Sequence, residues 1–452
     1  MARTPVTGSS GSPSPRGPGT SVLFVSLLVV LAVTGALARP GQSGSDGAGA
    51  WRQWGGPDRN FISSATGLAD SWPADGPPLL WRRPLGLGHS AIMADEGVLY
   101  TLYRPGKEIS RRGPWESLER VIAMDAATGK TLWEYEYASE PLDFSFGPGP
   151  HASPLIAGPL VFTVGTNKQV HAFEKRTGRL VWSHDLVKEY GSPPGLLRPG
   201  VKAGYGSSPL AYKDLILMQA GGDGQAVMAF RQKDGSLAWK SGDFLTAEAA
   251  PLLIDVDGQT QLVVFAGQGV NGLDPDTGRI IWSHPHDTDG DMNNSMPVWG
   301  SDNVLFITSA YNQGSRALRL ARKGEKTEVE ELWFTNRFRL MFSNALRLGD
   351  FIYGSSGDFG PAFFGALDIR TGTLAWQERG FGRVSLLHAD GKTIVLDEDG
   401  DLALVRLSPK GMEILSTTRV FGTTSWTVPT LVGTTLYARD RAEVVALALG
   451  GR

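Results

Sequence analysis

Four oxygen-bearing side chains alternate along one short stretch near the middle of the chain. They are Asp287, Asp289, Asp291 and Asn293. Carboxylate and amide oxygens at this spacing are the ligands that a hard cation such as Ca²⁺ takes up. The stretch lacks the downstream bidentate Glu of an EF-hand loop, and the same residue types are common in solvated turns. The pattern therefore predicts either a calcium site or a surface turn.

Two histidines, His284 and His286, precede this stretch. Side chains two residues apart on a strand face the same side, so this pair could bind a metal ion together. No third ligand is evident beyond the nearby Asp287 and Asp289, and an ordinary pair of surface histidines is the alternative. The sequence shows no Ser-His-Asp spacing, no phosphate-binding loop and no H-E-x-x-H motif.

An internal repeat must position any such chemistry. A motif recurs at residues 123–133, 172–182, 229–239, 272–282 and 366–376. Each copy has a small residue at its first position, a Gly at its seventh and a Trp at its eleventh. Five matches at one fixed spacing indicate a repeat fold rather than coincidence.

Each copy of the motif is typical of a β-hairpin. Alternating apolar residues form a strand, Thr-Gly or Asp-Gly makes a tight turn, and a second strand follows. The Trp can then lie flat on the turn of a neighbouring copy, where only small residues leave room for the ring. We therefore predict a structural docking role, without chemistry, for Trp81, Trp133, Trp182, Trp239, Trp282, Trp333 and Trp376.

Two further copies are degenerate, and the chain ends explain how the repeat closes. One copy runs from Ala317 to Trp333 with an insertion rich in Lys and Glu, and the other replaces Trp with Leu415. The chain ends in a strand at 444–449, with no room for an outer strand, whereas residues 79–82 form an outer strand without a partner. Joining these two ends closes a ring and leaves no sheet edge open.

A second hairpin precedes each motif, as at residues 153–163 and 208–218, which gives four strands per unit. Residues 79–450 then divide into eight units of about 46 residues, the size of a propeller blade. We predict an all-β fold, an eight-bladed β-propeller of four-stranded antiparallel blades whose last blade is shared by the N- and C-terminal strands. Residues 51–78 form a lead-in segment, and residues 79–452 form the propeller.

The first 38 residues have the features of an export signal. Arg3 and Arg16 supply the positive end before the apolar residues 22–33, and residues 36–38 form an A-x-A cleavage site. We expect cleavage of this signal peptide, residence in the periplasm or outside the cell, and no membrane span in the mature chain. A retained N-terminal membrane anchor is the alternative. Residues 39–50 have the composition of a flexible linker.

The mouth of the propeller channel is the natural place for a ligand. One end of such a channel is rimmed by the loops that lead into the innermost strands, which we call inlet loops. Here these loops are polar and of mixed charge, which suits either a ligand funnel or a solvent-filled mouth lined by satisfied groups. The candidate ligand residues are His89, His151, Tyr205, Glu248, Asn294, Ser343, Asn344, Arg383 and Trp426.

Three long loops, at residues 104–119, 138–150 and 188–203, could serve recognition. The first carries Arg111, Arg112 and Trp115, and the second carries Phe144 and Phe146. Exposed aromatic side chains in such loops suit a partner protein or the face of a sugar. The alternative is that they fold down and cap the ends of the blades.

The A-x-D-x-x-T-G-x-x-x-W unit resembles the repeat of dehydrogenases that depend on pyrroloquinoline quinone (PQQ), and of non-enzymatic relatives that include the outer-membrane assembly propellers. The resemblance covers essentially the whole chain after the signal. Residues 51–60 also read W-x-x-W-x-G-P-x-R, which resembles the lead-in of secreted PQQ-like propellers. The resemblance implies a quinone clamped between a Trp and a vicinal disulfide in the dehydrogenases, and an N-terminal lipidated Cys in the assembly propellers. This chain contains no Cys.

Composition and motifs together favour binding over catalysis. A net charge of −3 gives no broad attraction to nucleic acid. We expect an exported, non-catalytic and monomeric propeller without a cofactor, which binds a protein or carbohydrate partner through its channel mouth and long loops. The alternative is a PQQ- and Ca²⁺-dependent oxidoreductase acting on alcohols or sugars. In it Arg383 would hold PQQ, Trp426 would stack on it, and Glu248 or Asn294 would bind Ca²⁺.

Overall fold

The computed structural model describes residues 49–106, 115–141, 146–194 and 204–451. The chain divides into two units, Met1–Pro40 and Gly41–Arg452. The predicted signal peptide and residues 39–48 of the predicted linker lie outside the described residues, as do Arg111, Arg112 and Phe144. None of the helices in the described part of the chain is long and apolar enough to span a membrane.

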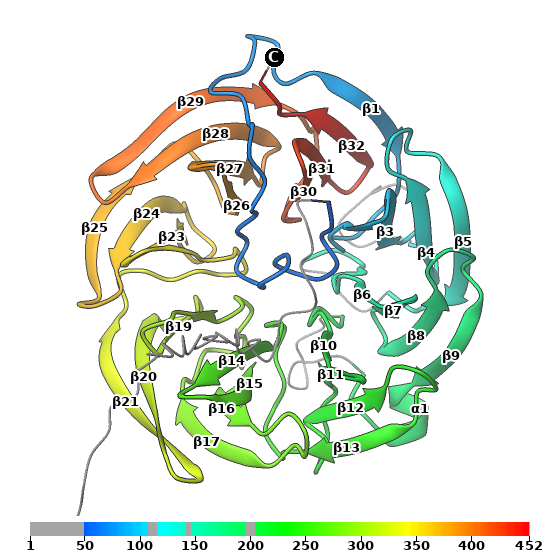
Figure 1. Ribbon diagram of the computed structural model, residues 1–452, viewed down its shortest axis with the longest axis vertical. Coiled ribbons are helices and arrows are strands. Elements are labelled where there is room, and N and C mark those ends of the chain that lie inside the picture. The colour runs from blue at the N-terminus through cyan, green and yellow to red at the C-terminus, as the bar shows by residue number, and fades with distance from the viewer. Residues whose placement is uncertain (1–48, 107–114, 142–145, 195–203, 452) are drawn as a thin grey trace, which may run out of the picture. The chain divides into compact units, whose positions relative to one another are not determined.

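Eight four-stranded antiparallel sheets form a ring in the second unit (Figure 1), which confirms the predicted eight-bladed propeller. Within a blade, consecutive strands pair side by side from the channel outward. The inner strands are buried against neighbouring blades, as the pattern of Val98–Tyr103 shows, whereas the outermost strand alternates between exposed and half-buried side chains, as in Thr131–Ala138. This alternation is expected where one face of a strand meets water.

The first four blades follow one another along the chain. Their strands are β2 (Met93–Asp95), β3 (Val98–Tyr103), β4 (Leu118–Asp125) and β5 (Thr131–Ala138); β6 (Leu155–Ala157), β7 (Leu160–Val164), β8 (Gln169–Glu174) and β9 (Leu180–Asp185); β10 (Leu210–Tyr212), β11 (Leu215–Gln219), β12 (Val227–Arg231) and β13 (Leu237–Ser241); β14 (Leu252–Val256), β15 (Gln259–Ala266), β16 (Gly269–Leu273) and β17 (Ile280–Pro285). A single short helix, α1 (Leu186–Tyr190), follows β9 among the described residues.

The last four blades complete the ring. Their strands are β18 (Val298–Trp299), β19 (Val304–Thr308), β20 (Ser315–Lys323) and β21 (Lys326–Thr335); β22 (Leu346–Leu348), β23 (Phe351–Ser356), β24 (Phe363–Asp368) and β25 (Thr373–Glu378); β26 (Val384–Ala389), β27 (Lys392–Asp397), β28 (Asp401–Ser408) and β29 (Gly411–Arg419); β30 (Thr430–Val432), β31 (Thr435–Arg439), β32 (Glu443–Ala448) and β1 (Leu79–Pro84).

The eighth blade joins the two ends of the propeller, as the sequence predicts. Strand β1 pairs antiparallel with β32, with Trp81 opposite Ala446. The buried Arg439 then reaches from this blade to the first one, where its guanidinium donates hydrogen bonds to the carbonyl oxygens of Gly86, Ser90 and Leu102. Because these carbonyls are buried, the arginine satisfies acceptors that would otherwise be costly to bury.

The repeat tryptophans dock on the following blade. In the first blade, Trp133 donates from Nε1 to the carbonyl of Lys175 at 3.0 Å, and its ring lies against Gly178 in the turn of the second blade. A carbon added at Gly178 would lie 2.5 Å from that ring. The same contact recurs between Trp81 and Gly129, Trp182 and Gly235, Trp239 and Gly278, and Trp333 and Gly372, and Trp376 donates to the carbonyl of Ser408.

One tryptophan departs from this arrangement. Trp282 donates to the side-chain oxygen of Gln261 in its own blade at 2.7 Å. The fifth blade has the long hairpin of β20 and β21 in place of the repeat turn, so no turn carbonyl stands at the usual place. Gln261 makes the link to the fifth blade instead, because its amide donates to the hydroxyl of Thr327.

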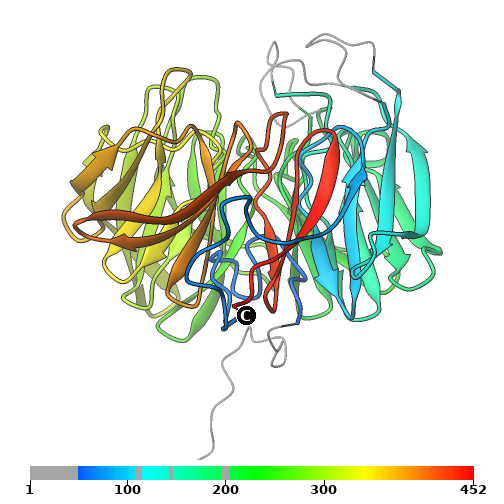
Figure 2. The same ribbon diagram turned by 90° about the horizontal axis from the view of Figure 1, so that it is seen from above.

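The lead-in, residues 51–78, closes one end of the channel. Its backbone pairs with the first blade at Trp51 and Ala94, and with the seventh at Ile62 and His388. Figure 1 shows this segment crossing the opening of the ring, and Figure 2 shows it at the end of the channel where the C-terminus lies. It then covers β29, where Trp72 packs in one cluster with Leu415, the residue that replaces the repeat Trp.

Two glycines of the second blade allow the docking contact to be tested. Gly158 and Gly178 both have positive φ, of 54° and 69°, so an added side chain strains both backbones alike. Nothing lies near a carbon added at Gly158, whereas the Trp133 ring blocks one at Gly178. We expect Gly178→Ala to lower the free energy of unfolding by about 1–3 kcal/mol more than Gly158→Ala does. The thermal unfolding midpoint of Gly178→Ala should therefore be the lower of the two. Equal midpoints would show that the docking contact contributes nothing.

Candidate functional site

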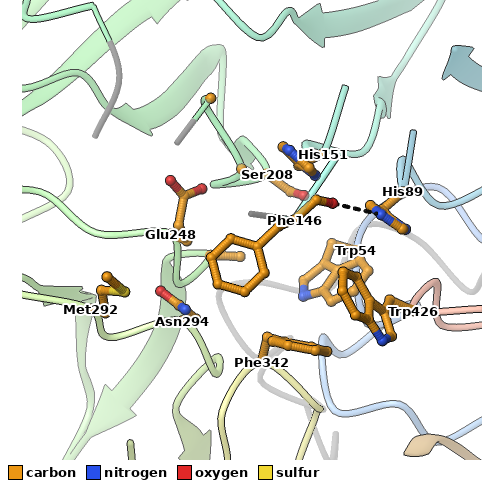
Figure 3. Close-up of a pocket in the computed structure, with 13 residues that line it drawn as sticks. Trp54, His89, Phe146, His151, Ser208, Glu248, Met292, Asn294, Phe342 and Trp426 are labelled. Atoms are coloured by element: carbon orange, nitrogen blue, oxygen red, sulfur yellow. Dashed lines mark hydrogen bonds between the residues drawn. The ribbon is translucent and has the colours of Figure 1, made fainter. Parts of the chain in front are cut away.

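A cavity of about 150 Å³ lies at the mouth of the channel (Figure 3). The inlet loops of seven blades supply most of its lining, because each loop ends beside the axis of the ring. The lead-in contributes one side chain from the opposite end. The lining residues are Trp54, His89, Phe146, His151, Gly204, Gly206, Ser208, Glu248, Ala250, Met292, Asn294, Phe342 and Trp426.

Five of the candidate residues from the sequence line this cavity, namely His89, His151, Glu248, Asn294 and Trp426. The other four do not. Their side chains or backbones serve the fold, since each makes contacts within or between blades. They are Tyr205, Ser343, Asn344 and Arg383.

The contacts of three of these residues explain their absence from the cavity. Tyr205 is fully buried, and its hydroxyl donates to the carbonyl of Gln219. The amide of Asn344 bonds to both the backbone N–H and the carbonyl of Leu386, which pairs the sixth and seventh blades. Arg383 forms an ion pair with Glu398 at 3.0 Å. The Tyr205 hydroxyl and the Asn344 amide are therefore already hydrogen-bonded, as buried polar groups usually are.

One wall of the cavity is aromatic. The ring centroids of Phe342 and Trp426 lie 4.7 Å apart, and Phe146 lies 6.0 Å from Phe342 and 6.2 Å from Trp426. Glu398 fixes Trp426 by accepting its Nε1–H at 2.9 Å. Phe146 belongs to the second long loop, so this aromatic residue folds over the cavity rather than pointing away from the protein.

A stack of imidazoles continues the aromatic wall. His89 lies parallel to His151, with centroids 5.6 Å apart, and 5.1 Å from the ring of Trp426. Burial and the positive charge of Arg441 hold the pKa of His89 well below its usual value. His89 is therefore neutral near pH 7.

The hydrogen bonds of His89 assign its proton. Arg441 can only donate, and its Nε lies 3.1 Å from Nε2 of His89. The carbonyl of Phe146 is equally close to Nε2 (Figure 3), but it accepts from Nη2 of Arg441 at 2.7 Å. An accepting Nε2 satisfies all three groups and leaves the proton on Nδ1. This Nδ1 has no hydrogen-bond partner among the described residues.

The opposite side of the cavity is polar. Figure 3 shows Glu248 and Asn294 across the cavity from His89 and Trp426. The carboxylate of Glu248 lies so close to Gly206 that a carbon added there would stand 2.0 Å from Oε2, so only Gly allows this approach. The amide nitrogen of Asn294 lies 3.4 Å from the hydroxyl of Tyr311, and its Oδ1 has no partner in the described part of the chain.

The lead-in supplies the floor. Trp54 lines the cavity, and its ring meets Phe61 edge-on with centroids 5.5 Å apart. Phe61 packs in one apolar cluster with Ala250, Met296 and the innermost strands of neighbouring blades. Because the lead-in crosses the far end of the channel, its Trp54 lines the cavity from that end.

The predicted calcium stretch does not gather around a single point. Among the described residues, no group of three or more His, Cys, Asp or Glu side chains could hold a metal ion. Asn293 is fully buried, its Oδ1 accepts from Ser309, and its amide donates to the carbonyl of Ala266. Asp289 accepts a hydrogen bond from Asn312. These contacts are those of a structured turn.

The histidine pair meets a guanidinium instead of a metal. Arg316 lies 3.1 Å from Nδ1 of His286 and pairs with Glu331, which also lies 3.3 Å from Nε2 of His284. A fixed positive charge at this distance opposes the binding of a cation. Burial, with the charge of Arg316, lowers the pKa of His286 to about 3.

Several lining residues were not predicted from the sequence. Trp54 belongs to a motif that the sequence singled out, but its target lies in blades far along the chain. Phe342 stands directly before Ser343, which was predicted instead, and Met292 lies between Asp291 and Asn293, which were predicted as calcium ligands. The inlet-loop residues predicted from the sequence are mostly polar, whereas half of the cavity wall is apolar, as is common for ligand pockets.

The ring of eight blades with docked tryptophans defines a β-propeller of the quinoprotein type. Residues 117–378 match the model of the family described as outer membrane protein assembly factor BamB, and this match spans more than half of the chain. The chain belongs to this family of PQQ-like propellers. A comparison with curated proteins found no match.

Solved structures share the fold at low sequence identity. BamB from Moraxella catarrhalis is 16% identical with a TM-score of 0.55, over 82% of this chain and 99% of that one. A quinohemoprotein alcohol dehydrogenase from Comamonas testosteroni is 12% identical with a TM-score of 0.61, over 89% and 81%. The computationally designed Ika8 protein is 11% identical with a TM-score of 0.55, over 82% and 100%. Such likeness shows the fold alone and does not separate binding from catalysis.

The cavity does not fit PQQ, the cofactor that the dehydrogenases carry. PQQ is a fused-ring tricarboxylate, whereas a cavity of this volume holds about one six-membered ring. No Lys or Arg of the described residues lines it, and the carboxylate of Glu248 does. Arg383, the predicted PQQ ligand, is paired with Glu398.

The buried imidazole of His286 predicts a pH dependence of stability. Its pKa is about 3 in the folded protein and about 6.5 in the unfolded chain, so below pH 6.5 the unfolded state binds a proton that the folded state lacks. Stability is therefore lost as the pH falls from about 6.5 towards 3, by up to about 1.4 kcal/mol per pH unit. We expect His286→Phe to reduce the drop in unfolding midpoint between about pH 7 and about pH 5.

The neighbouring Phe265, whose ring lies 5.1 Å from His286, provides the control. Phe265→Leu should lower the midpoint at both pH values without changing the difference between them. A His286→Phe protein with the full wild-type pH difference would contradict the buried neutral state.

Proposed function

We propose that this chain is an exported, monomeric binding propeller that holds one sugar ring in the mouth of its channel, without PQQ or calcium. The observation that carries the proposal is a one-ring cavity with an aromatic wall on one side and hydrogen-bonding groups on the other. A pyranose has matching faces, because its C–H groups form an apolar face and its hydroxyls form a polar rim.

The polar groups favour a sugar over a side chain of a partner protein. An aromatic side chain would fill the volume, but in the described part of the chain it would leave Nδ1 of His89 and Oδ1 of Asn294 without hydrogen-bond partners in a buried contact. Each unsatisfied polar group costs about 1–3 kcal/mol. Sugar hydroxyls both donate and accept, so they can bond to a carboxylate, an amide oxygen and an imidazole N–H at once.

Export is part of the same proposal. The A-x-A site at residues 36–38 supports removal of a signal peptide, residues 1–38, before a flexible linker at 39–50. The family is described by a protein of outer-membrane assembly, which places that protein in the cell envelope. A propeller in the periplasm or outside the cell would meet envelope and extracellular saccharides.

A glycan array followed by calorimetric titration tests the proposal. We expect binding of at least one saccharide class, and a loss of at least about tenfold in affinity in Glu248→Gln and in Trp426→Ala, since each removes one wall of contacts. Glu325→Gln, in the exposed hairpin of the fifth blade, should bind like the wild type. Absence of any saccharide ligand, or full binding by Glu248→Gln, would contradict the proposal.

The PQQ-dependent alternative has its own readout. We expect titration with PQQ and Ca²⁺ to change neither the absorbance spectrum nor the thermal unfolding midpoint, because the cavity is too small and has the wrong charge. A saturable shift in midpoint on adding both would support the oxidoreductase and count against a binding propeller without cofactor.

A further inference from the structure

An exposed aromatic side chain is linked to the cavity lining through one intervening residue, Tyr311. Phe359, in the loop between β23 and β24, is 74% exposed. Its ring meets that of Tyr311 edge-on, with centroids 5.7 Å apart. The hydroxyl of Tyr311 lies 3.4 Å from the amide nitrogen of Asn294, which lines the cavity. An aromatic path therefore leads from the cavity to the rim.

The loop that carries Phe359 is held in place on both sides of this residue. The carbonyl oxygens of Asp358 and Gly360 both accept from Nη2 of Arg383. The Asp358 carboxylate accepts the backbone N–H of Tyr311 at 2.8 Å and pairs with Arg339 at 3.2 Å. A large apolar ring is thus presented to solvent by a loop that is held in place on both sides.

In the described part of the chain, inlet loops surround the cavity and Trp54 of the lead-in lies at its inner end, so the cavity opens at the channel mouth. An internal unit of a polymer carries linkages on two sides, and both would have to leave through the same opening. A terminal unit carries a single linkage, which can point outwards.

We propose that the ligand is the end of a linear oligosaccharide or polysaccharide, with its terminal ring in the cavity and the adjoining unit stacked on Phe359. This inference rests on the proposed function and narrows it to a substrate class. Arg383, which sequence reasoning placed in the binding site, acts as a positioning residue because it fixes the loop of Phe359.

Chain-length dependence tests this inference. The probes are the mono- to tetrasaccharides of the malto-, cello- and chito- series, titrated calorimetrically. We expect a disaccharide to bind about tenfold more tightly than its monosaccharide, with little gain beyond it, since one further stacking platform is present. Phe359→Ala should remove this gain and leave the affinity for the monosaccharide unchanged. Phe334→Ala, at another exposed aromatic on β21, should retain the gain.

A cyclic oligosaccharide separates end recognition from simple stacking. If the malto- series binds, α-cyclodextrin, which has no chain end, should bind at least about tenfold more weakly than the linear tetrasaccharide. If another series binds, its disaccharide is reduced, which opens the ring at the reducing end. Loss of binding then shows that the reducing end enters the cavity, and retained binding shows that the other end does. One of the two ends must be required.

The outcomes distinguish this inference from the proposed function. Equal affinity for mono- and disaccharides, an unchanged gain in Phe359→Ala, or tight binding of an end-free ligand overturns end recognition while the saccharide site stands. Failure of every saccharide to bind overturns both, and capture of a protein partner that Phe359→Ala weakens would assign the aromatic path to protein recognition instead.

Discussion

The contact on which this structure depends is the tryptophan of one blade lying on the turn glycine of the next. Burial of a large ring stabilises each seam that has this contact by about 1.5–3 kcal/mol, and the Nε1–H supplies a directional bond to a turn carbonyl. The glycine is required twice over, because it has a positive φ and because any side chain would strike the ring. Repeating this contact around a ring leaves each inner strand at a fixed distance from the axis.

The channel and its cavity follow from that regularity. Every inlet loop ends beside the axis, so residues from seven blades meet at one place although they lie far apart along the chain. The lead-in breaks the regularity by bringing Trp54 and Phe61 into the channel from the other end. It also covers the seam where Leu415 stands in place of a tryptophan. Without it the channel would be open at both ends, and the cavity would have no floor.

The sequence predicts the parts of this protein that repeat and only partly those that do not. Spacing between Gly and Trp is a local property, so the blades, their number and the shared last blade could all be inferred from it. The inlet loops could be placed at the mouth for the same reason. Which side chain of a loop turns inwards depends on contacts with other blades, which local patterns do not reveal. Asn344 bonds to Leu386 and does not line the cavity, while Phe342, two residues earlier, does.

The charges around the cavity explain why it suits binding better than chemistry. Arg383 is neutralised by Glu398, and burial together with the positive charge of Arg441 keeps His89 uncharged. A general acid or base works best with a pKa near the working pH and a free path for its proton. Here the His89 imidazole is held neutral well outside that range, and its accepting nitrogen is already occupied by Arg441. The remaining groups are fixed donors and acceptors beside rigid rings, which is the arrangement that orients a neutral, hydroxyl-rich ligand without reacting with it.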